Sequence, residues 1–448
     1  MTASQTTREA AVRPAPSAVP RKPRVGIVGA GPSGIAAAKA MLQAGLDDLV
    51  LFERNNQVGG NWIYSPQSSH SSVFETTHII SSKALSQYDD FPMPADYPDY
   101  PDHLQLKQYF QAYARHFDVE RHIRFGVEVT KIARLADNRW RVTPDRGAAE
   151  DFDHLLIANG HHWKPRMPDY PGNFAGDILH SHDFKSAAPF AGKRVLVIGG
   201  GNSACDIAVE TSRVSASTAI SMRRGYWFLP KFLMGLPADV LHQKTMAKLP
   251  RALRGPMLKW TLRLTQGSNS LYGLEEPKHG PFQVHPTVNS ELLYFIRHGK
   301  IQPRRDIARY DGHRVYFTDG SSGEFDVIIA ATGFITSHPF LERSVADYGG
   351  TEVPLYLKVF HPTCENLYFI GLFQPLGCIW PLADYQGRLV AKAIQGGWQR
   401  PGDIAASIAR ELAHPDYPWI KTPRHAVEVD YHAYRKRLIG ELAGRRAF

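Results

Sequence analysis

The chain has 448 residues, of which 43% are hydrophobic and 21% are charged, and its formal charge at pH 7 is +9. These values exclude global disorder, a collagen-like fibre and a disulfide-rich miniprotein, and the length suits two or three domains. The positive surplus favours anionic ligands such as phosphates, whereas the absence of any run of five Lys or Arg residues speaks against a nucleic-acid partner.

Residues 1–23 are rich in Ala, Pro, Ser and Thr, a composition that predicts a disordered tail. Their arginines leave an organelle transit peptide as the alternative. No apolar run reaches the roughly 18–20 residues of a membrane helix, so we do not expect a membrane protein. Cys205, Cys364 and Cys378 form no closely spaced pair, which favours a reducing compartment and a cytoplasmic location.

The first predicted unit starts with a β-branched strand at residues 24–28, followed by a glycine turn, a helical stretch at 35–43 and a second apolar run at 49–52. Strand, glycine turn, helix and strand in this order make half of a Rossmann unit, in which the phosphates of a dinucleotide lie at the helix N-terminus. The turn residues predicted to bind a dinucleotide are Gly29, Ala30, Gly31, Pro32, Ser33 and Gly34.

A second copy of this unit lies near the middle of the chain. Its strand at 193–198 leads into a glycine turn, a helix at 205–211 and a strand at 218–222. The turn residues predicted to bind are Gly199, Gly201, Asn202, Ser203 and Ala204. Two such units imply two dinucleotides, or one shared between the halves; a purely structural glycine turn is the alternative for each.

The residue that ends the second strand distinguishes the two units. Glu53 follows Gly34 by 19 residues, and Arg223 follows Ala204 by the same 19. A carboxylate at this position accepts hydrogen bonds from a free ribose hydroxyl, whereas an arginine pairs with a 2′-phosphate. We therefore predict FAD or NAD in the first unit and NADP in the second, with Arg224 as a helper; solvated surface arginines are the alternative.

The order of the elements predicts that one unit is inserted into the other. Strands at 152–158 and 325–331 each end in a polar residue and a glycine, so each is expected to close one nucleotide-binding unit. The fold class is α/β, with two nested Rossmann-like dinucleotide-binding domains. The expected domains are an FAD-binding part at 24–167, an NADP-binding domain with a helical insertion at 168–332, and a second FAD-binding part with C-terminal helices at 333–448.

Two nucleotide sites in this order suggest a flavoenzyme that NADPH reduces, and a further segment narrows the class. Residues 174–185 (FAGDILHSHDFK) resemble the F-x-G-x-x-x-H-x-x-x-(Y/F)-K fingerprint of flavin-containing monooxygenases, and they lie between the two glycine turns as in that family. Similar segments occur at 59–62, 90–92, 221–225 and 369–386. The resemblance implies that Arg54, Asn61, Trp62 and Gln374 also contact the cofactors.

The resemblance also implies a reaction. NADPH reduces FAD, O2 adds to the flavin as a C4a-hydroperoxide, and bound NADP protects it until a substrate atom takes one oxygen. The implied function is a monooxygenase acting on a nucleophilic nitrogen or sulfur of a small lipophilic amine or thioether. The protein then supplies position and water exclusion. No metal is expected, and no H-E-x-x-H motif occurs.

One departure from the family pattern concerns the segment expected beside the flavin. The pattern has an Asn where this chain has Ile80, in the segment 80–83 (ISSK). Isoleucine offers no hydrogen bond, so His78, on the same face of an extended segment, or the Ser81 hydroxyl could replace the missing donor. His78 could instead be an ordinary core histidine, and the loss of Asn could produce NADPH oxidase activity.

Several alternatives stay open from the sequence. The enzyme could be a Baeyer–Villiger monooxygenase acting on a ketone, an NADPH oxidase, or a non-catalytic flavin-binding protein. The apolar stretches 227–236 and 256–264 are most simply the core of an insertion, but could form a substrate entrance, a homodimer face or a membrane-surface helix. We expect His180 and Phe184 to hold an interdomain turn, and residues 384–386 to cap the flavin ring by resemblance.

Overall fold

The computed structural model describes residues 21–245, 249–416 and 419–445. Residues 1–20 of the predicted tail therefore lie outside the described residues. At the end of that segment Arg21 forms an ion pair with Asp153 at 2.8 Å, and Lys22 forms one with Asp47 at 3.0 Å.

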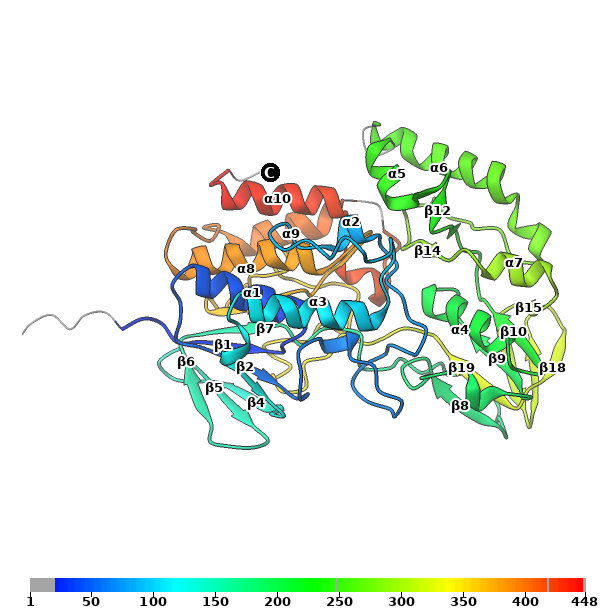
Figure 1. The fold of residues 1–448 in the computed structure, drawn as a ribbon, viewed down its shortest axis with the longest axis horizontal. Coiled ribbons are helices and arrows are strands. Elements are labelled where there is room, and N and C mark those ends of the chain that lie inside the picture. Colours follow the sequence, from blue (N-terminus) through cyan, green and yellow to red (C-terminus); the bar gives the residue numbers. More distant parts are fainter. Residues whose placement is uncertain (1–20, 246–248, 417–418, 446–448) are drawn as a thin grey trace, which may run out of the picture.

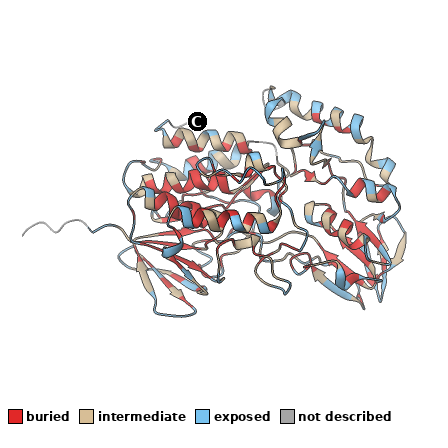
Figure 2. Ribbon diagram, in the orientation of Figure 1, coloured by how far each residue is buried: buried red, intermediate tan, exposed pale blue. Residues whose placement is uncertain are grey.

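A five-stranded parallel sheet forms the centre of the first lobe (Figure 1). Its order is β20 (Leu367–Phe369), β7 (His154–Ile157), β1 (Val25–Val28), β2 (Leu49–Glu53) and β3 (Ile123–Phe125). The helices of this lobe are α1 (Pro32–Gln43), α2 (Lys83–Ser86), α3 (His103–His116), α8 (Trp380–Ile394), α9 (Ile404–Ala413) and α10 (Tyr431–Leu442). The central strands β1, β2 and β7 are largely buried (Figure 2), because helices α1, α3 and α8 pack on one face of the sheet and a small antiparallel sheet packs on the other.

The second lobe contains a second five-stranded parallel sheet. Its order is β15 (Ile301–Arg304), β10 (Ser217–Ser221), β9 (Arg194–Ile198), β19 (Val327–Ala330) and β8 (Asp177–His180), with α4 (Asn202–Ser212) and α7 (Leu292–Arg297) packed against it. All its strands come from the chain between β7 and β20. The predicted class, α/β with two nested Rossmann-like domains, is confirmed.

The chain passes between the two sheets twice, once after β7 and once after β19, and the two crossings lie beside each other. The Arg166 N–H donates to the Gly333 carbonyl at 2.9 Å, and the Ile335 N–H donates to the Lys164 carbonyl at 2.9 Å. Two antiparallel segments thus form a short ribbon that connects the lobes.

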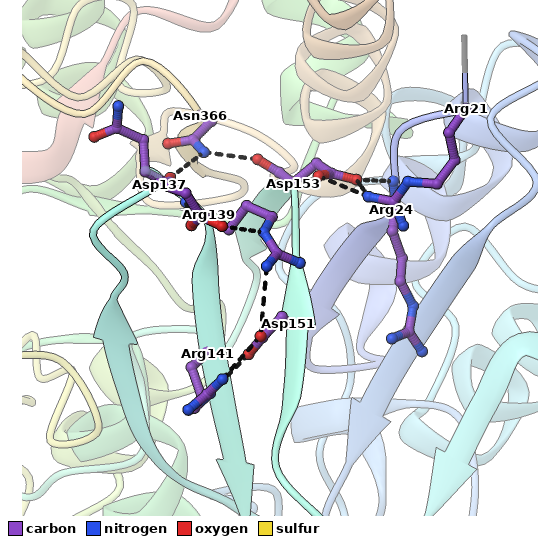
Figure 3. A network of polar contacts seen from close by, with 9 residues as sticks. Arg21, Arg24, Asp137, Arg139, Arg141, Asp151, Asp153 and Asn366 are labelled. Atoms are coloured by element: carbon purple, nitrogen blue, oxygen red, sulfur yellow. Dashed lines mark hydrogen bonds and ion pairs between the residues drawn. The ribbon is translucent and has the colours of Figure 1, made fainter. Parts of the chain in front are cut away.

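A small antiparallel sheet flanks each parallel sheet. The first comprises β4 (Val129–Arg134), β5 (Trp140–Pro144) and β6 (Glu150–Phe152), and the second comprises β16 (Ile307–Asp311), β17 (Arg314–Phe317) and β18 (Ser322–Glu324). Polar contacts connect the strands of the first small antiparallel sheet to each other, and others lie where the chain around it meets this sheet (Figure 3). Arg141 pairs with Asp151 across β5 and β6 at 2.7 Å, and the Asn366 amide donates to the Asp153 carbonyl at 2.6 Å.

The insertion of the second lobe contains the short strands β11 (Phe228–Leu229), β12 (Phe232–Leu233), β13 (Leu236–Pro237) and β14 (Thr287–Val288), with helices α5 (Ala238–Lys244) and α6 (Arg251–Gln266). Trp227, Leu258 and Leu262 pack together in its interior. Met234, however, is 93% exposed and Trp260 is 67% exposed. The interpretation of the two stretches 227–236 and 256–264 as insertion core is therefore wrong for Met234, between β12 and β13, and for one face of α6.

The last helix packs one face inward, as its spacing predicts: Tyr434 and Leu438 of α10 are buried against the first lobe. The neighbouring interpretation of residues 384–386 as a flavin cap is wrong. The Asp384 carboxylate pairs with Lys39, and the Gln386 side chain accepts from the Gly371 N–H at 2.9 Å, so both point into the protein interior. Within the described ranges, no helix is long and apolar enough to cross a membrane.

Candidate active site

A cavity of about 1350 Å³ lies between the two lobes, and both glycine turns line it. Most of the predicted site residues meet there: Gly29, Gly31, Pro32, Ser33, Glu53, Arg54, Asn61, Trp62, His78, Ile80, Ser81, Gly199, Gly201, Asn202, Ser203, Ala204, Arg223, Arg224 and Gln374. Ala30 and Gly34 are buried behind the first turn and do not line the cavity. In the described part of the chain, no group of three or more His, Cys, Asp or Glu side chains could hold a metal ion.

The first glycine turn needs its glycines for steric reasons. Gly29 has φ of +103°, and a Cβ there would stand 2.6 Å from the Ala158 carbonyl oxygen. A Cβ on Gly34 would stand 2.0 Å from the Gly29 carbonyl oxygen. Helix α1 begins directly after Gly31, and no side chain caps its first turn. The residues present therefore fit the pyrophosphate of a dinucleotide, whose oxygens would accept hydrogen bonds from the uncapped N–H groups.

Glu53 lies at the carboxyl end of β2, where its side chain is only 5% exposed. Its Oε2 accepts from the Ala30 N–H at 2.8 Å, and its Oε1 accepts from the Asn55 N–H at 2.9 Å. The Asn55 side-chain amide also donates to Oε1 at 2.6 Å. Each carboxylate oxygen has about two lone-pair sites, so Oε2 can still accept a ribose hydroxyl. Ala30 thus orients the carboxylate from behind the turn.

The second glycine turn repeats the geometry of the first. Gly199 has φ of +134°, and a Cβ there would stand 2.5 Å from the Ala331 carbonyl oxygen. Helix α4 begins after Gly201, again with no capping side chain. The Thr287 hydroxyl donates to the Gly200 carbonyl at 2.7 Å. This turn also fits a pyrophosphate, and β14 holds it in place.

Arg223 and Arg224 follow the last residue of β10, as the position of a ribose-recognising residue requires. Arg223 is exposed and makes no ion pair with any described residue. The Arg224 guanidinium lies 5.4 Å from the centre of the Tyr226 ring. Both line the cavity, so the Arg223 guanidinium is available to an anionic group.

The segment around Ile80 lines the same cavity, with partners that the sequence does not reveal. The Ser81 hydroxyl is 2.8 Å from the Ser86 hydroxyl in the interior. The His78 Nδ1 lies 2.8 Å from the Thr76 carbonyl oxygen, while the residue as a whole is exposed. Both candidate donors therefore have a local partner, and their part in the reaction stays a prediction.

The fingerprint residues pack within the second lobe and also contact the first lobe. A Cβ on Gly176 would stand 2.3 Å from the Asp326 carbonyl oxygen, so only glycine fits there. The Lys185 ammonium donates to the Ser71 carbonyl of the first lobe at 2.6 Å. Next to it, the Phe184 ring meets the Phe74 ring with centroids 5.2 Å apart.

His180 of the fingerprint binds the crossing segment. Its Nδ1 accepts from the His182 N–H at 3.1 Å, so its Nε2 carries the hydrogen and donates to the Gly333 carbonyl at 3.0 Å. Burial lowers the pKa of His180 to about 4, which keeps the imidazole neutral at pH 7. The contacts of His180 and Phe184 agree with their expected place at an interdomain turn.

The buried imidazoles make stability depend on pH. Burial also lowers the pKa of His338 and that of His425 to about 4. In the unfolded chain a histidine side chain binds its proton near pH 6.5. Between pH 6.5 and 4 the unfolded chain therefore holds more protons than the folded protein. We expect the free energy of unfolding to fall as the pH is lowered from 6.5 to 4, by up to about 3 kcal/mol for each imidazole.

Urea unfolding at a series of pH values measures this effect. The variant His338→Phe should flatten the profile between pH 6.5 and 4, whereas His116→Phe, at an exposed position, should leave its shape unchanged. A profile that is equally steep in both variants would contradict the expectation.

Two parallel sheets that each present a glycine turn to one shared cavity are typical of an oxidoreductase with two dinucleotide sites. The sequence profile of the flavin-binding monooxygenase-like family matches residues 22–444. Flavin-containing monooxygenase 5 of Mus musculus is 34% identical over 433 residues, which cover 92% of this chain and 81% of that protein. Dimethylaniline monooxygenase [N-oxide-forming] 2 of Oryctolagus cuniculus is 33% identical, with 83% of this chain and 73% of that protein covered.

The fold is similar to solved structures. S-allyl-L-cysteine S-oxygenase from Allium sativum superposes with a TM-score of 0.70 at 23% identity, covering 95% of this chain and 89% of that one. Cyclohexanone monooxygenase in complex with ε-caprolactone gives 0.70 at 17% identity, covering 94% and 98%.

The chain belongs to the flavin-binding monooxygenase-like family. It is an NADPH-dependent flavin monooxygenase with FAD and NADP as cofactors, and O2 and a small molecule are its substrates.

Proposed function

We propose that the enzyme transfers one oxygen atom from O2 to a nucleophilic nitrogen or sulfur of a small lipophilic compound. The observation that carries the proposal is the single cavity lined by both glycine turns, because one cavity allows a reduced nicotinamide and a flavin to meet. The relatives named for N-oxide formation and for S-oxygenation support nitrogen and sulfur as the atoms oxidised.

FAD is proposed to occupy the first lobe. The turn 29–34 would hold its pyrophosphate, Glu53 its ribose, and Arg54, Asn61, Trp62 and Gln374 the remainder. NADP is proposed to occupy the second lobe, on the turn 199–204 with Arg223 and Arg224 at its 2′-phosphate. When bound, the flavin supplies the electron transfer from NADPH and the activation of O2.

The residues of the chain then position the reactants and exclude water. The Trp62 and Trp380 rings meet at right angles with centroids 5.8 Å apart, and both line the cavity with Ile80. Such an apolar wall lowers the local dielectric and leaves few places for water. An uncharged amine or a thioether suits this wall better than an ion does.

Incubation of the holoenzyme with NADPH, ¹⁸O2 and either a thioether or a cyclic ketone tests the proposal. We expect one ¹⁸O atom in a sulfoxide. Ring expansion of the ketone alone would identify a Baeyer–Villiger enzyme, and stoichiometric hydrogen peroxide with every substrate would identify an NADPH oxidase.

Ile80 is proposed to make the coupling between NADPH consumption and oxygenation leaky. The variant Ile80→Asn places a hydrogen-bonding group in the cavity wall, so we expect roughly fivefold slower release of hydrogen peroxide, the effect of about 1 kcal/mol from one hydrogen bond. A peroxidase-coupled assay without substrate measures the release. Ile80→Val keeps the wall apolar and should match the parent; equal release from Ile80→Asn would refute the role of this position.

His78 is a candidate replacement for the missing donor. We propose that it limits the same leak, so His78→Ala should release more peroxide than the parent, and an unchanged release would dismiss it.

We further propose a reducing, cytoplasmic setting, which the three buried free cysteines support. A homodimer stays a prediction that sedimentation analysis decides.

A further inference from the structure

The carboxy-terminal part of the first lobe reaches across the cavity to the second glycine turn. The strand β22 (Glu428–Val429) pairs with β21 (Gln374–Pro375) of the first lobe, with Glu428 opposite Gln374. Directly before it, residues 423–427 form a short 3-10 helix. Thr422, Pro423, Arg424, Val427 and Glu428 all line the cavity.

Arg424 faces the second turn from the opposite lobe. Its Nη1 and Nη2 lie 3.5 and 3.6 Å from where a Cβ on Gly201 would stand. Gly201 precedes helix α4, whose uncapped N-terminus carries partial positive charge. Arg424 makes no ion pair with any described residue, so two positive groups face each other. Arg424 is exposed, so water can solvate its guanidinium, but an anion placed between the two positive groups would be attracted by both.

Glu428 of the same segment is also incompletely paired. Its Oε2 lies 3.1 Å from the Nδ1 of His285, which belongs to the second lobe. Its Oε1 is buried and has no hydrogen-bond partner among the described residues, and Glu428 as a whole is only 6% exposed. A buried carboxylate oxygen without a donor is costly, so it calls for an O–H or N–H group from a ligand.

His285 also connects this carboxylate to the second turn. It lies two residues before Thr287, which bonds the Gly200 carbonyl, and the Val288 N–H donates to the Asn202 side chain at 2.7 Å. The free oxygen of Glu428 and the Arg424 guanidinium thus converge on one turn from the other lobe.

We propose that residues 422–429 form a clasp by which the first lobe grips the dinucleotide bound to the second lobe. Arg424 neutralises the pyrophosphate, and Glu428 accepts a hydrogen bond from the nicotinamide half. The clasp rests on the proposed placement of NADP at the second turn. The ligand it takes is a dinucleotide with a negatively charged bridge, and binding of that ligand ties the two lobes together.

Calorimetric titration of the FAD-loaded enzyme with two ligands tests the clasp. NADP⁺ has the pyrophosphate and the nicotinamide, whereas adenosine 2′-monophosphate has neither but retains the 2′-phosphate. Arg424→Ala should weaken NADP⁺ binding about tenfold or more, as expected for the loss of a charged hydrogen bond, and leave the 2′-monophosphate affinity unchanged. Arg424→Lys should recover part of the loss, and Glu428→Gln should weaken NADP⁺ alone.

Two further variants separate this inference from the proposed function. Arg223→Ala should weaken both ligands, and Arg343→Ala, which removes an exposed arginine away from the cavity, should weaken neither. Parent-like NADP⁺ binding by Arg424→Ala, while Arg223→Ala binds weakly, would overturn the clasp and leave the NADP site standing. Parent-like binding of both ligands by Arg223→Ala would overturn the NADP site, and the clasp with it.

Discussion

The variant Arg223→Ala should raise the KM for NADPH about tenfold to hundredfold and change the KM for NADH little. A charged hydrogen bond contributes roughly 1.5–3 kcal/mol, which corresponds to this range. Arg223 lines the cavity at the end of β10 and has no described carboxylate partner, so its loss costs no internal ion pair. NADH lacks the 2′-phosphate and therefore gains nothing from the arginine.

Steady-state rates with each nucleotide measure this preference. Arg343→Ala provides the matched control, because it removes the same charge from an exposed position away from the cavity. An equal rise in both KM values would mean that Arg223 acts on a part common to the two nucleotides and would remove its assignment to the 2′-phosphate.

The variant Lys39→Met should lower the free energy of unfolding by about 3–5 kcal/mol, the usual cost of removing one partner from a buried ion pair. Lys39 of α1 is 0% exposed. Its ammonium lies 2.7 Å from an oxygen of Asp384 and 2.6 Å from an oxygen of Asp90. Burial already raises the pKa of Asp384, and Lys39 opposes that rise. Its removal leaves Arg388, 2.6 Å from the other carboxylate oxygen, as the remaining cation of this group, and leaves the oxygen that faces α1 without its partner.

Urea unfolding of the holoenzyme measures the loss. Lys22→Met removes an exposed lysine that pairs with Asp47, and it should cost less than about 1 kcal/mol. If the two variants lost the same free energy, the buried pair would have no special part in joining the helices.

The sequence predicts those parts of the site that depend on local order. Gly29, Gly199, Glu53 and Arg223 are fixed by their distance from a strand end, because a strand, a turn and a helix of regular length place each residue in space. The nested sheets follow from the same regularity. The nested order of the two sheets, and the position of these four residues on one cavity, therefore agree between sequence and structure.

Other parts of the site could not be predicted, for physical reasons. Arg424 and Glu428 come from a short C-terminal segment, and His285 lies more than a hundred residues before them. No periodicity in the sequence indicates that these two segments meet. For α6, helical spacing shows that an apolar face exists but does not show which neighbours cover it, so the exposure of Trp260 appears only in the fold. The pairing of Ser81 with Ser86 depends on the short helix α2, which follows Ser81 in the chain and ends at Ser86.

The paired crossings between the lobes determine which relative motions are available to them. A single linker would let one lobe swivel freely, whereas two hydrogen-bonded segments, joined through Arg166 to Gly333 and through Lys164 to Ile335, resist torsion about their common direction. Bending across the ribbon disturbs these bonds least. We therefore expect the lobes to move relative to each other by hinge bending about one axis. Such a motion would restore the same angle between nicotinamide and flavin each time the lobes close.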